Sequence, residues 1–179
     1  MKQFLILIAG ILFAINLHAQ KYSTKTGQVS FYSKAPLEDI KADNRQGSFI
    51  LDASTGEVAA VILIKSFEFK NSLMQDHFND NYLESEKFPK STFTGKVTNI
   101  QDVKFDKNGT YDVKVAGQLT IHGVTKEITE TGKVSVKGDT VIIESAFFVA
   151  LADFGIKNDK VKNIAERIEV TVNAELKKK

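Results

Sequence analysis

The stretch Tyr111–Thr125 reads YDVKVAGQLTIHGVT, and its pattern decides how the chain is expected to fold. Every second position from Tyr111 to Ile121 is apolar or glycine, whereas the positions between them, from Asp112 to His122, are mostly polar. Successive side chains of a β-strand point to opposite faces of the sheet. The alternation therefore predicts a strand with one dry face and one wet face.

Turn signals on both sides of this strand predict antiparallel neighbours. Asn108-Gly109 precedes it, and Asn-Gly favours a two-residue hairpin because both residues tolerate positive φ. Gly123 ends the strand, and residues 126–136 are predicted to form the next one. The centre of the protein is therefore expected to be an antiparallel meander.

The same reasoning divides the rest of the chain. Residues 37–45 are mainly polar and predict a loop or a short helical turn, and a turn is expected at residues 52–56. Ser72 and Gln75 resemble a capping box at the start of a helix. An apolar stripe at helical spacing follows, made of Met74, Phe78 and Tyr82. Further strands are predicted over residues 22–35 (continuous, or broken at Gly27), 46–51, 57–69, 92–100, 140–151 and 166–176.

About eight strands and one main helix define an all-β fold, and several of the strands exceed the usual ~5–6 residues. Long antiparallel strands avoid exposed edges by closing into a barrel. We therefore predict an extended antiparallel eight-stranded β-barrel with one short helix between strands. Such a barrel is either filled by its own side chains or holds one ligand, and the strand count leaves both open. The length of the strands favours a chain-shaped guest.

The first residues predict export. Lys2 is the only charged residue ahead of an apolar run from Phe4 to Leu17, and Leu17-His18-Ala19 resembles a cleavage site before Gln20. A membrane anchor is the alternative, but the run is shorter than the ~20 apolar residues of a full span. We expect residues 1–19 to be a cleaved signal peptide and residues 20–179 to form one periplasmic domain, with no stable membrane insertion after cleavage.

Composition narrows the classes of partner. The chain has 24 basic and 22 acidic side chains and no cysteine. Once Lys2 is removed the net charge is +1, which gives no field to attract nucleic acid or an anionic membrane. The lack of cysteine excludes disulfides and a lipid-modified N-terminal cysteine, so the apolar core alone must hold the mature chain together.

Sequence motifs of enzymes are missing. The chain has no Gly-x-Ser-x-Gly elbow, no Gly-x-Gly-x-x-Gly turn and no phosphate-binding loop. His77 lies between Asp76 and Asp80, which suggests either a metal site or a polar helix flank near the barrel mouth. Zinc needs three or four converging ligands, and this helix supplies at most two. His122 is expected to be solvated or to cap a strand, and Glu144 is expected to face outward rather than into a cavity. We therefore predict no catalytic residue, no metal and no cofactor.

Candidate ligand-binding residues are the apolar side chains at inward positions of the predicted strands. The alternative for each of them is an ordinary core residue. Gly95 and Gly117 leave space inside the wall or mark bends. The candidates are Phe67, Phe69, Phe93, Val113, Val115, Leu119, Phe147 and Val149 along the lumen, with Met74, Phe78 and Phe154 near one end.

Four motifs, in this order along the chain, carry a resemblance to a known family. They are Asp76-His77, the run Phe88-Pro89-Lys90-Ser91-Thr92-Phe93, the strand-turn-strand GQLTIHGVTKEIT at 117–129, and Asp153-Phe154-Gly155-Ile156. Together they resemble the YceI-like family of exported lipid-binding proteins, and the resemblance covers essentially the whole mature chain.

The resemblance implies a lipocalin-like barrel that binds a polyisoprenoid or similar lipid in its lumen and has no catalytic residues. The chain departs from the family pattern at Gln75 and Leu151, where basic residues are common, so a neutral or different headgroup is expected. The partner is then an isoprenoid or another long-chain lipid, with a homodimer left open. The alternatives are a ligand-free structural or interaction barrel that serves a cell-envelope complex and, ranked last, a hydrolase.

Overall fold

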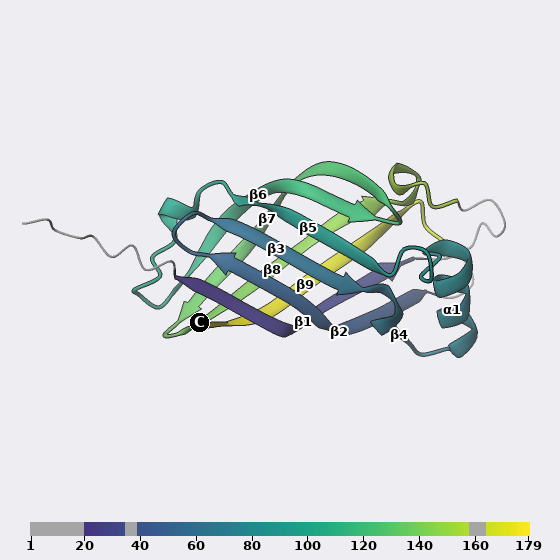
Figure 1. Cartoon of the computed structure of the whole chain (residues 1–179), viewed down its shortest axis with the longest axis horizontal. Helices are drawn as coiled ribbons and strands as arrows, with labels where there is room; N and C mark the ends of the chain where they lie inside the picture. Colours follow the sequence, from purple (N-terminus) through teal and green to yellow (C-terminus); the bar gives the residue numbers. More distant parts are fainter. Residues whose placement is uncertain (1–19, 35–38, 158–163) are drawn as a thin grey trace, which may run out of the picture.

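The computed structural model describes residues 20–34, 39–157 and 164–179, and the predicted signal peptide lies outside these ranges. Eight long strands and one short helix make up the fold (Figure 1). The strands are β1 (Lys21–Ser33), β2 (Ile40–Asp52), β3 (Glu57–Leu63), β5 (Lys90–Val97), β6 (Gly109–Ile121), β7 (Val124–Lys137), β8 (Thr140–Ala150) and β9 (Arg167–Lys178).

Smaller elements stand between these strands. The helix α1 (Ser72–His77) continues into a π-helical turn at Phe78–Tyr82. A two-residue strand, β4 (Glu68–Phe69), precedes it. Short 3₁₀ turns occupy Ile64–Ser66, Ile100–Asp102 and Leu151–Phe154. No helix among the described residues has the length and apolar character needed to cross a membrane.

The strands close on themselves. The hydrogen-bonded order is β1-β9-β8-β7-β6-β5-β3-β2, and β2 pairs back to β1 in an antiparallel ladder. β4 adds to β2 through the pairs Ala42–Phe69 and Asp43–Glu68. The predicted all-β, eight-stranded antiparallel barrel with one short helix is therefore confirmed, and closure leaves its long strands without a free sheet edge at most positions.

The two ends of the barrel differ. The closed end, which we define by Tyr22, Leu51 and Leu176, is packed with side chains that have no exposed surface. Phe105, from the loop before β6, stacks on Tyr22 with ring centroids 5.7 Å apart. Burying a side chain of this size contributes roughly 1.5–3 kcal/mol to stability. At the opposite end, which we call the helix end, α1 lies across the barrel (Figure 1).

The central strand has the two faces that its alternation predicts. Val113 and Leu119 of β6 are buried inside the barrel. Asp112 lies outside, where it accepts a hydrogen bond from Lys133 of the neighbouring β7 at 2.7 Å. This contact raises the pKa of the Lys133 amine, because the Asp112 carboxylate favours the charged form. The wet face is therefore an ordinary solvated surface.

The prediction of a loop or helical turn at 37–45 is wrong where the structure describes it, since β2 begins at Ile40. The polar residue Asn44 hides the strand pattern because it takes an inward position and is fully buried. Its amide donates to the carbonyl of Leu63 at 2.8 Å, and its side-chain oxygen accepts from the Gln46 amide at 2.9 Å. A buried side-chain amide whose donor and acceptor groups are both hydrogen-bonded costs little folding free energy.

The predicted long strand at 57–69 is also wrong, because β3 ends at Leu63 and a 3₁₀ turn follows. The helix start differs by one residue from the proposed capping box. Asn71 is the N-cap and accepts from the Leu73 amide at 2.9 Å, while Gln75 instead accepts from the Phe69 amide. Asn is among the best N-cap residues, and here it takes the position that Ser72 was expected to hold.

A tight hairpin was predicted before β6, at Asn108-Gly109, but the structure has it after β6, at His122-Gly123. His122 and Gly123 have φ of 50° and 74°, and they join the paired residues Ile121 and Val124 in a two-residue turn. Positive φ at both central residues is the requirement of a type I′ turn. Asn108-Gly109 makes no such turn; the Asn108 side chain instead accepts from the Gly138 amide at 2.8 Å. The Asn108-Gly109 hairpin prediction is therefore wrong.

Candidate functional site

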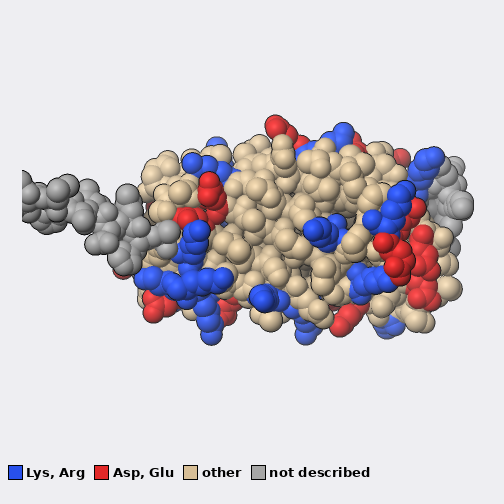
Figure 2. Space-filling view, in the orientation of Figure 1, with Lys and Arg blue, Asp and Glu red and all other residues tan. Residues whose placement is uncertain are grey.

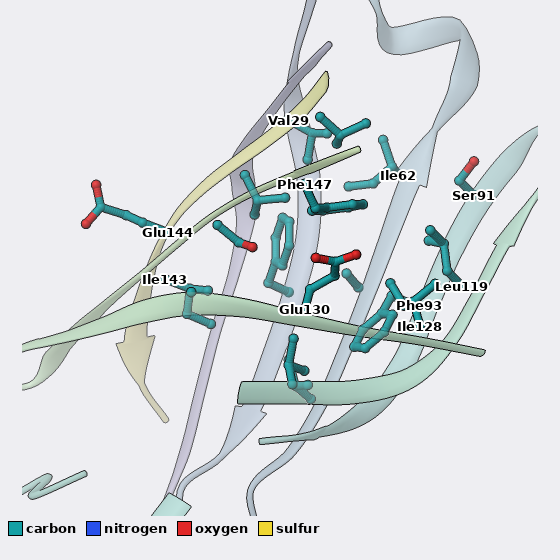
Figure 3. A pocket seen from close by; sticks show the side chains of 18 of the residues that line it. Val29, Ile62, Ser91, Phe93, Leu119, Ile128, Glu130, Ile143, Glu144 and Phe147 are labelled. Carbon is teal, nitrogen blue, oxygen red and sulfur yellow. The ribbon is translucent and has the colours of Figure 1, made fainter. Parts of the chain in front are cut away.

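The middle of the barrel contains an apolar cavity of about 170 Å³, which we call the central cavity (Figure 3). One water needs about 10–15 Å³ on this measure, so the lumen is not filled by its own side chains. Inward residues from all eight long strands line it. They include Val29, Phe49, Ile62, Phe93, Val113, Val115, Leu119, Ile128, Ile143, Phe147, Val149, Val170 and Val172.

A second cavity of about 280 Å³, the end cavity, lies beneath α1. Met74, Phe78 and Tyr82 all line it, so the apolar stripe of the predicted helix faces the barrel. Phe78 stacks on Phe31 with ring centroids 5.4 Å apart. The two cavities are adjacent along β9, where Ile168 lines the end cavity and Val170, two positions on, lines the central one.

The wall of the barrel is incomplete between β7 and β8. Their ladder ends at the pair Gly132–Ser145, so residues 124–131 of β7 pair with β6 alone and residues 146–150 of β8 pair with β9 alone. A groove of about 180 Å³ occupies this place, and we call it the side opening. It shares with the central cavity the residues Leu119, Ile128, Glu130, Phe147 and Val149. The central cavity and the side opening therefore lie next to each other at these residues.

The structure places ten of the eleven predicted lining residues beside these three spaces. Phe93, Val113, Val115, Leu119, Phe147 and Val149 line the central cavity, and Phe69, Met74 and Phe78 line the end cavity. Phe154 lines the side opening. Phe67 borders none of them: it is buried against Phe31 and Phe78 and belongs to the aromatic packing below the helix.

Gly95 and Gly117 do not leave space for a guest. They face each other across β5 and β6, and the ring of Phe93 covers both. A Cβ atom on Gly117 would lie 2.4 Å from the backbone of Gly95 and of Thr94. Both positions need glycine because the two backbones approach closely. The Phe93 ring fills the volume above them.

His122, which was expected to be solvated or to cap a strand, is half-buried and connects three segments at the helix end. Its Nε2 lies 2.7 Å from a carboxylate oxygen of Glu84, and its Nδ1 lies 3.3 Å from the carbonyl oxygen of Phe154. The ring also packs against the edge of Phe88, with centroids 4.6 Å apart. His122 and Glu84 are the two described non-glycine residues with positive φ. The tip of the β6–β7 hairpin is therefore tied to the loop after α1 and to the turn after β8.

Acidic and basic groups elsewhere do not assemble into a metal centre. His77 borders the end cavity, which agrees with a helix flank near the barrel mouth. In the part of the chain that the structure describes, no three His, Asp or Glu side chains are grouped closely enough to hold a metal ion. Two carboxyl groups have lowered pKa values for local reasons. The hydrogen bond from the Ser54 hydroxyl lowers the pKa of Asp52, and the hydrogen bond from Lys65 lowers the pKa of Glu86.

Sequence reasoning missed the lining residues of the N-terminal strands and one acidic side chain. Phe49 and Ile62 line the central cavity from β2 and β3. Glu130 lines it from β7, where Ile128, Glu130, Gly132 and Val134 share one face. The alternation of β7 was visible in the sequence and would have located Glu130. The candidates were apolar side chains only, and Glu130 is acidic.

These features place the chain among the closed antiparallel β-barrels that enclose an apolar cavity. A model of the YceI-like domain matches residues 15–176, and the chain belongs to the YceI-like family. This finding confirms the resemblance carried by the four motifs.

Solved structures of low sequence identity share the fold. A polyisoprenoid binding domain from Saccharophagus degradans, implicated in plant cell wall breakdown, aligns with a TM-score of 0.76 at 15% identity, covering 90% of this chain and 99% of that one. BcnA of Burkholderia cenocepacia has a TM-score of 0.68 at 17% identity, covering 84% and 95%. The YceI protein of Campylobacter jejuni has a TM-score of 0.63 at 19% identity, covering 82% and 89%. A search of curated protein sequences found no match.

The two departures from the family pattern have structural roles here. The side-chain oxygen of Gln75 accepts from the Phe69 amide and so links the helix to β4. Leu151 is buried and lines the end cavity. The end cavity is therefore lined by an apolar side chain at a position where the family resemblance implies a basic one. Among the described residues that line this cavity, His77 is the basic residue.

Proposed function

We propose that this protein is a periplasmic lipid-binding protein that holds a polyisoprenoid or a similar long apolar chain in its lumen, for transport, storage or sequestration. The observation that carries the proposal is the unfilled apolar space along the barrel axis, lined from all eight long strands. Each CH₂ group that a ligand buries there contributes about 0.8 kcal/mol, so a long tail needs little polar recognition. The S. degradans domain, which is named as polyisoprenoid-binding, supports the same class of ligand.

We also propose that the protein binds its ligand without catalysing a reaction, as the YceI-like family and the polyisoprenoid-binding neighbour suggest. Of the two described histidines, His122 is engaged at the surface end of a hairpin and His77 lies on the helix. In the described structure neither histidine forms a hydrogen bond to a serine or threonine hydroxyl, the pairing that activates such a nucleophile.

The test of lipid binding is mass spectrometry of an organic extract of the mature protein, purified from the cell envelope without detergent. We expect a long-chain lipid in an amount close to one molecule per protein molecule. The matched control is an extract of the Phe147→Asp variant prepared in the same way, which should contain much less of that lipid. An identical extract from both proteins, or no lipid in either, would contradict the proposal.

The alternative of a ligand-free interaction barrel has one observation in its favour. Ile50, Val61 and Leu63 are exposed on the outer face of β2 and β3, and the middle of the face in Figure 2 carries few charges. Such a surface suits a second copy of the chain or another envelope protein. The extraction experiment separates this alternative from lipid binding, because an empty barrel yields no lipid.

Export to the periplasm rests on Lys2, the apolar run from Phe4 to Leu17 and the Leu17-His18-Ala19 site. We expect N-terminal sequencing of the protein from whole cells to start at Gln20, and the protein to be released when the outer envelope is opened. A variant that lacks residues 2–19 should stay inside the cell. Recovery of intact Met1 in the membrane fraction would show that the segment is an anchor instead.

A further inference from the structure

One acidic side chain lies inside the central cavity. Glu130 is on the inward face of β7, directly opposite Val115 of β6 and between Ile128 and Gly132. Figure 3 shows its carboxyl group among the apolar lining side chains, whereas Glu144, on β8, points away from them. The pattern of β7 therefore presents a carboxyl group to the lumen at mid-barrel.

This carboxyl group has no partner among the described residues. Within residues 20–34, 39–157 and 164–179, it makes no hydrogen bond and no ion pair. The described residues that line the central cavity include no Lys, Arg or His. Lys126 borders the side opening on the same face of β7, four residues away, which corresponds to about 13 Å along a strand. Glu130 is thus half-buried in an apolar space where an unpaired charge is costly.

Glu130 also lies where the lumen meets the surface. It lines both the central cavity and the side opening, beyond the last pair of the β7–β8 ladder at Gly132 and Ser145. A molecule that passes through the side opening moves past this carboxyl group. A ligand group that donates a hydrogen bond would satisfy it, and an anionic group would be repelled by it.

We propose that Glu130 is a specificity-determining residue: the lumen takes a long-chain lipid with a hydrogen-bond donor, a primary amine above all, and disfavours one with a phosphate head. This inference rests on the proposed lipid-binding function and adds the chemistry of the head to it. The amine donates to the Glu130 carboxylate while the tail fills the central cavity. A charge-assisted hydrogen bond of this kind corresponds to a preference of about tenfold or more.

The experiment measures displacement of diphenylhexatriene, a fluorescent hydrocarbon without a polar group, from the mature protein by oleylamine, oleyl alcohol and oleyl phosphate. For the parent we expect the amine to bind about tenfold or more tightly than the phosphate, with the alcohol between them. Glu130→Leu should bring the ratio of amine to phosphate affinity close to one while diphenylhexatriene still binds. Glu130→Gln, which keeps the side-chain size and a hydrogen-bond acceptor, should lose most of the preference for the amine over the phosphate. This variant provides the test if Glu130→Leu does not fold.

The matched control is Glu144→Gln, which removes the same charge from the outward face of the neighbouring strand and should leave the ratio unchanged. If the parent binds all the probes and its ratio survives in both Glu130 variants, or if the phosphate binds best, the role of Glu130 is wrong while lipid binding stands. If neither diphenylhexatriene nor any oleyl probe binds the parent, lipid binding and the role of Glu130 are both wrong.

Discussion

Replacement of Phe147 with aspartate should abolish retention of a long-chain lipid and lower the free energy of unfolding by about 3 kcal/mol. The Phe147 side chain lines both the central cavity and the side opening. The substitution removes an aromatic ring from the lumen wall and puts a carboxylate among hydrocarbon side chains. Urea denaturation followed by circular dichroism measures the stability, and extraction with mass spectrometry measures the lipid.

The control for this substitution is its neighbour. Phe148 is 57% exposed on the outer face of β8, at the surface of the side opening, and the Arg167 guanidinium lies 5.5 Å from its ring. Phe148→Asp makes the same chemical change one residue away, and we expect the stability to stay within roughly 0.5 kcal/mol, with lipid retained. Equal loss of lipid in both variants would show that the inward face of β8 has no special role in binding.

Replacement of Gly117 with valine should destabilise the barrel most and lower its free energy of unfolding by about 3 kcal/mol or more. The new Cβ would lie 2.4 Å from backbone atoms of Gly95 and Thr94, and 2.9 Å from the ring of Phe93. Backbone atoms cannot move aside as a flexible side chain can, so β5 and β6 must separate. The expected result is a lower midpoint of thermal unfolding and loss of the closed barrel, measured by calorimetry.

A valine at the next position gives the comparison. Gln118 is exposed on the outer face of β6, directly opposite Glu127, and valine suits a strand there. Gln118→Val should therefore change the midpoint only slightly. If Gly117→Val were tolerated as well as Gln118→Val, the close approach of β5 and β6 would not be needed for the fold.

The sequence was sufficient to predict the barrel because strand alternation is a local property. β6 and β9 carry an apolar residue or glycine at nearly every inward position, and their faces were predicted correctly. The helix stripe of Met74, Phe78 and Tyr82 was equally readable, since its spacing follows the helical repeat. Most of the lining residues follow from these two periodicities.

The errors arose where tertiary contacts override the local pattern. Asn44 is polar yet fully buried, because its side-chain amide donates to the Leu63 carbonyl on the neighbouring strand and its side-chain oxygen accepts from the Gln46 amide two residues along. His122 takes positive φ in a two-residue turn, where Glu84 and the Phe154 carbonyl hold its ring. The β7–β8 ladder ends at Gly132 and Ser145, and this end is a property of the pairing of two strands. The contacts with Leu63, Glu84 and Phe154, and the end of the ladder, are not encoded in a window of neighbouring residues.

The early end of that ladder has a consequence for the rate at which a guest is exchanged. Residues 124–131 of β7 are held by backbone hydrogen bonds from one side only, and the His122 contacts anchor their tip. Segments with fewer such bonds open at a lower free energy than the global unfolding of the chain. Uptake and release can therefore proceed by fraying of one hairpin, with the closed end around Tyr22 and Leu176 still intact. For the proposed lipid complex, the lifetime is then set by a local opening and not by global unfolding of the chain.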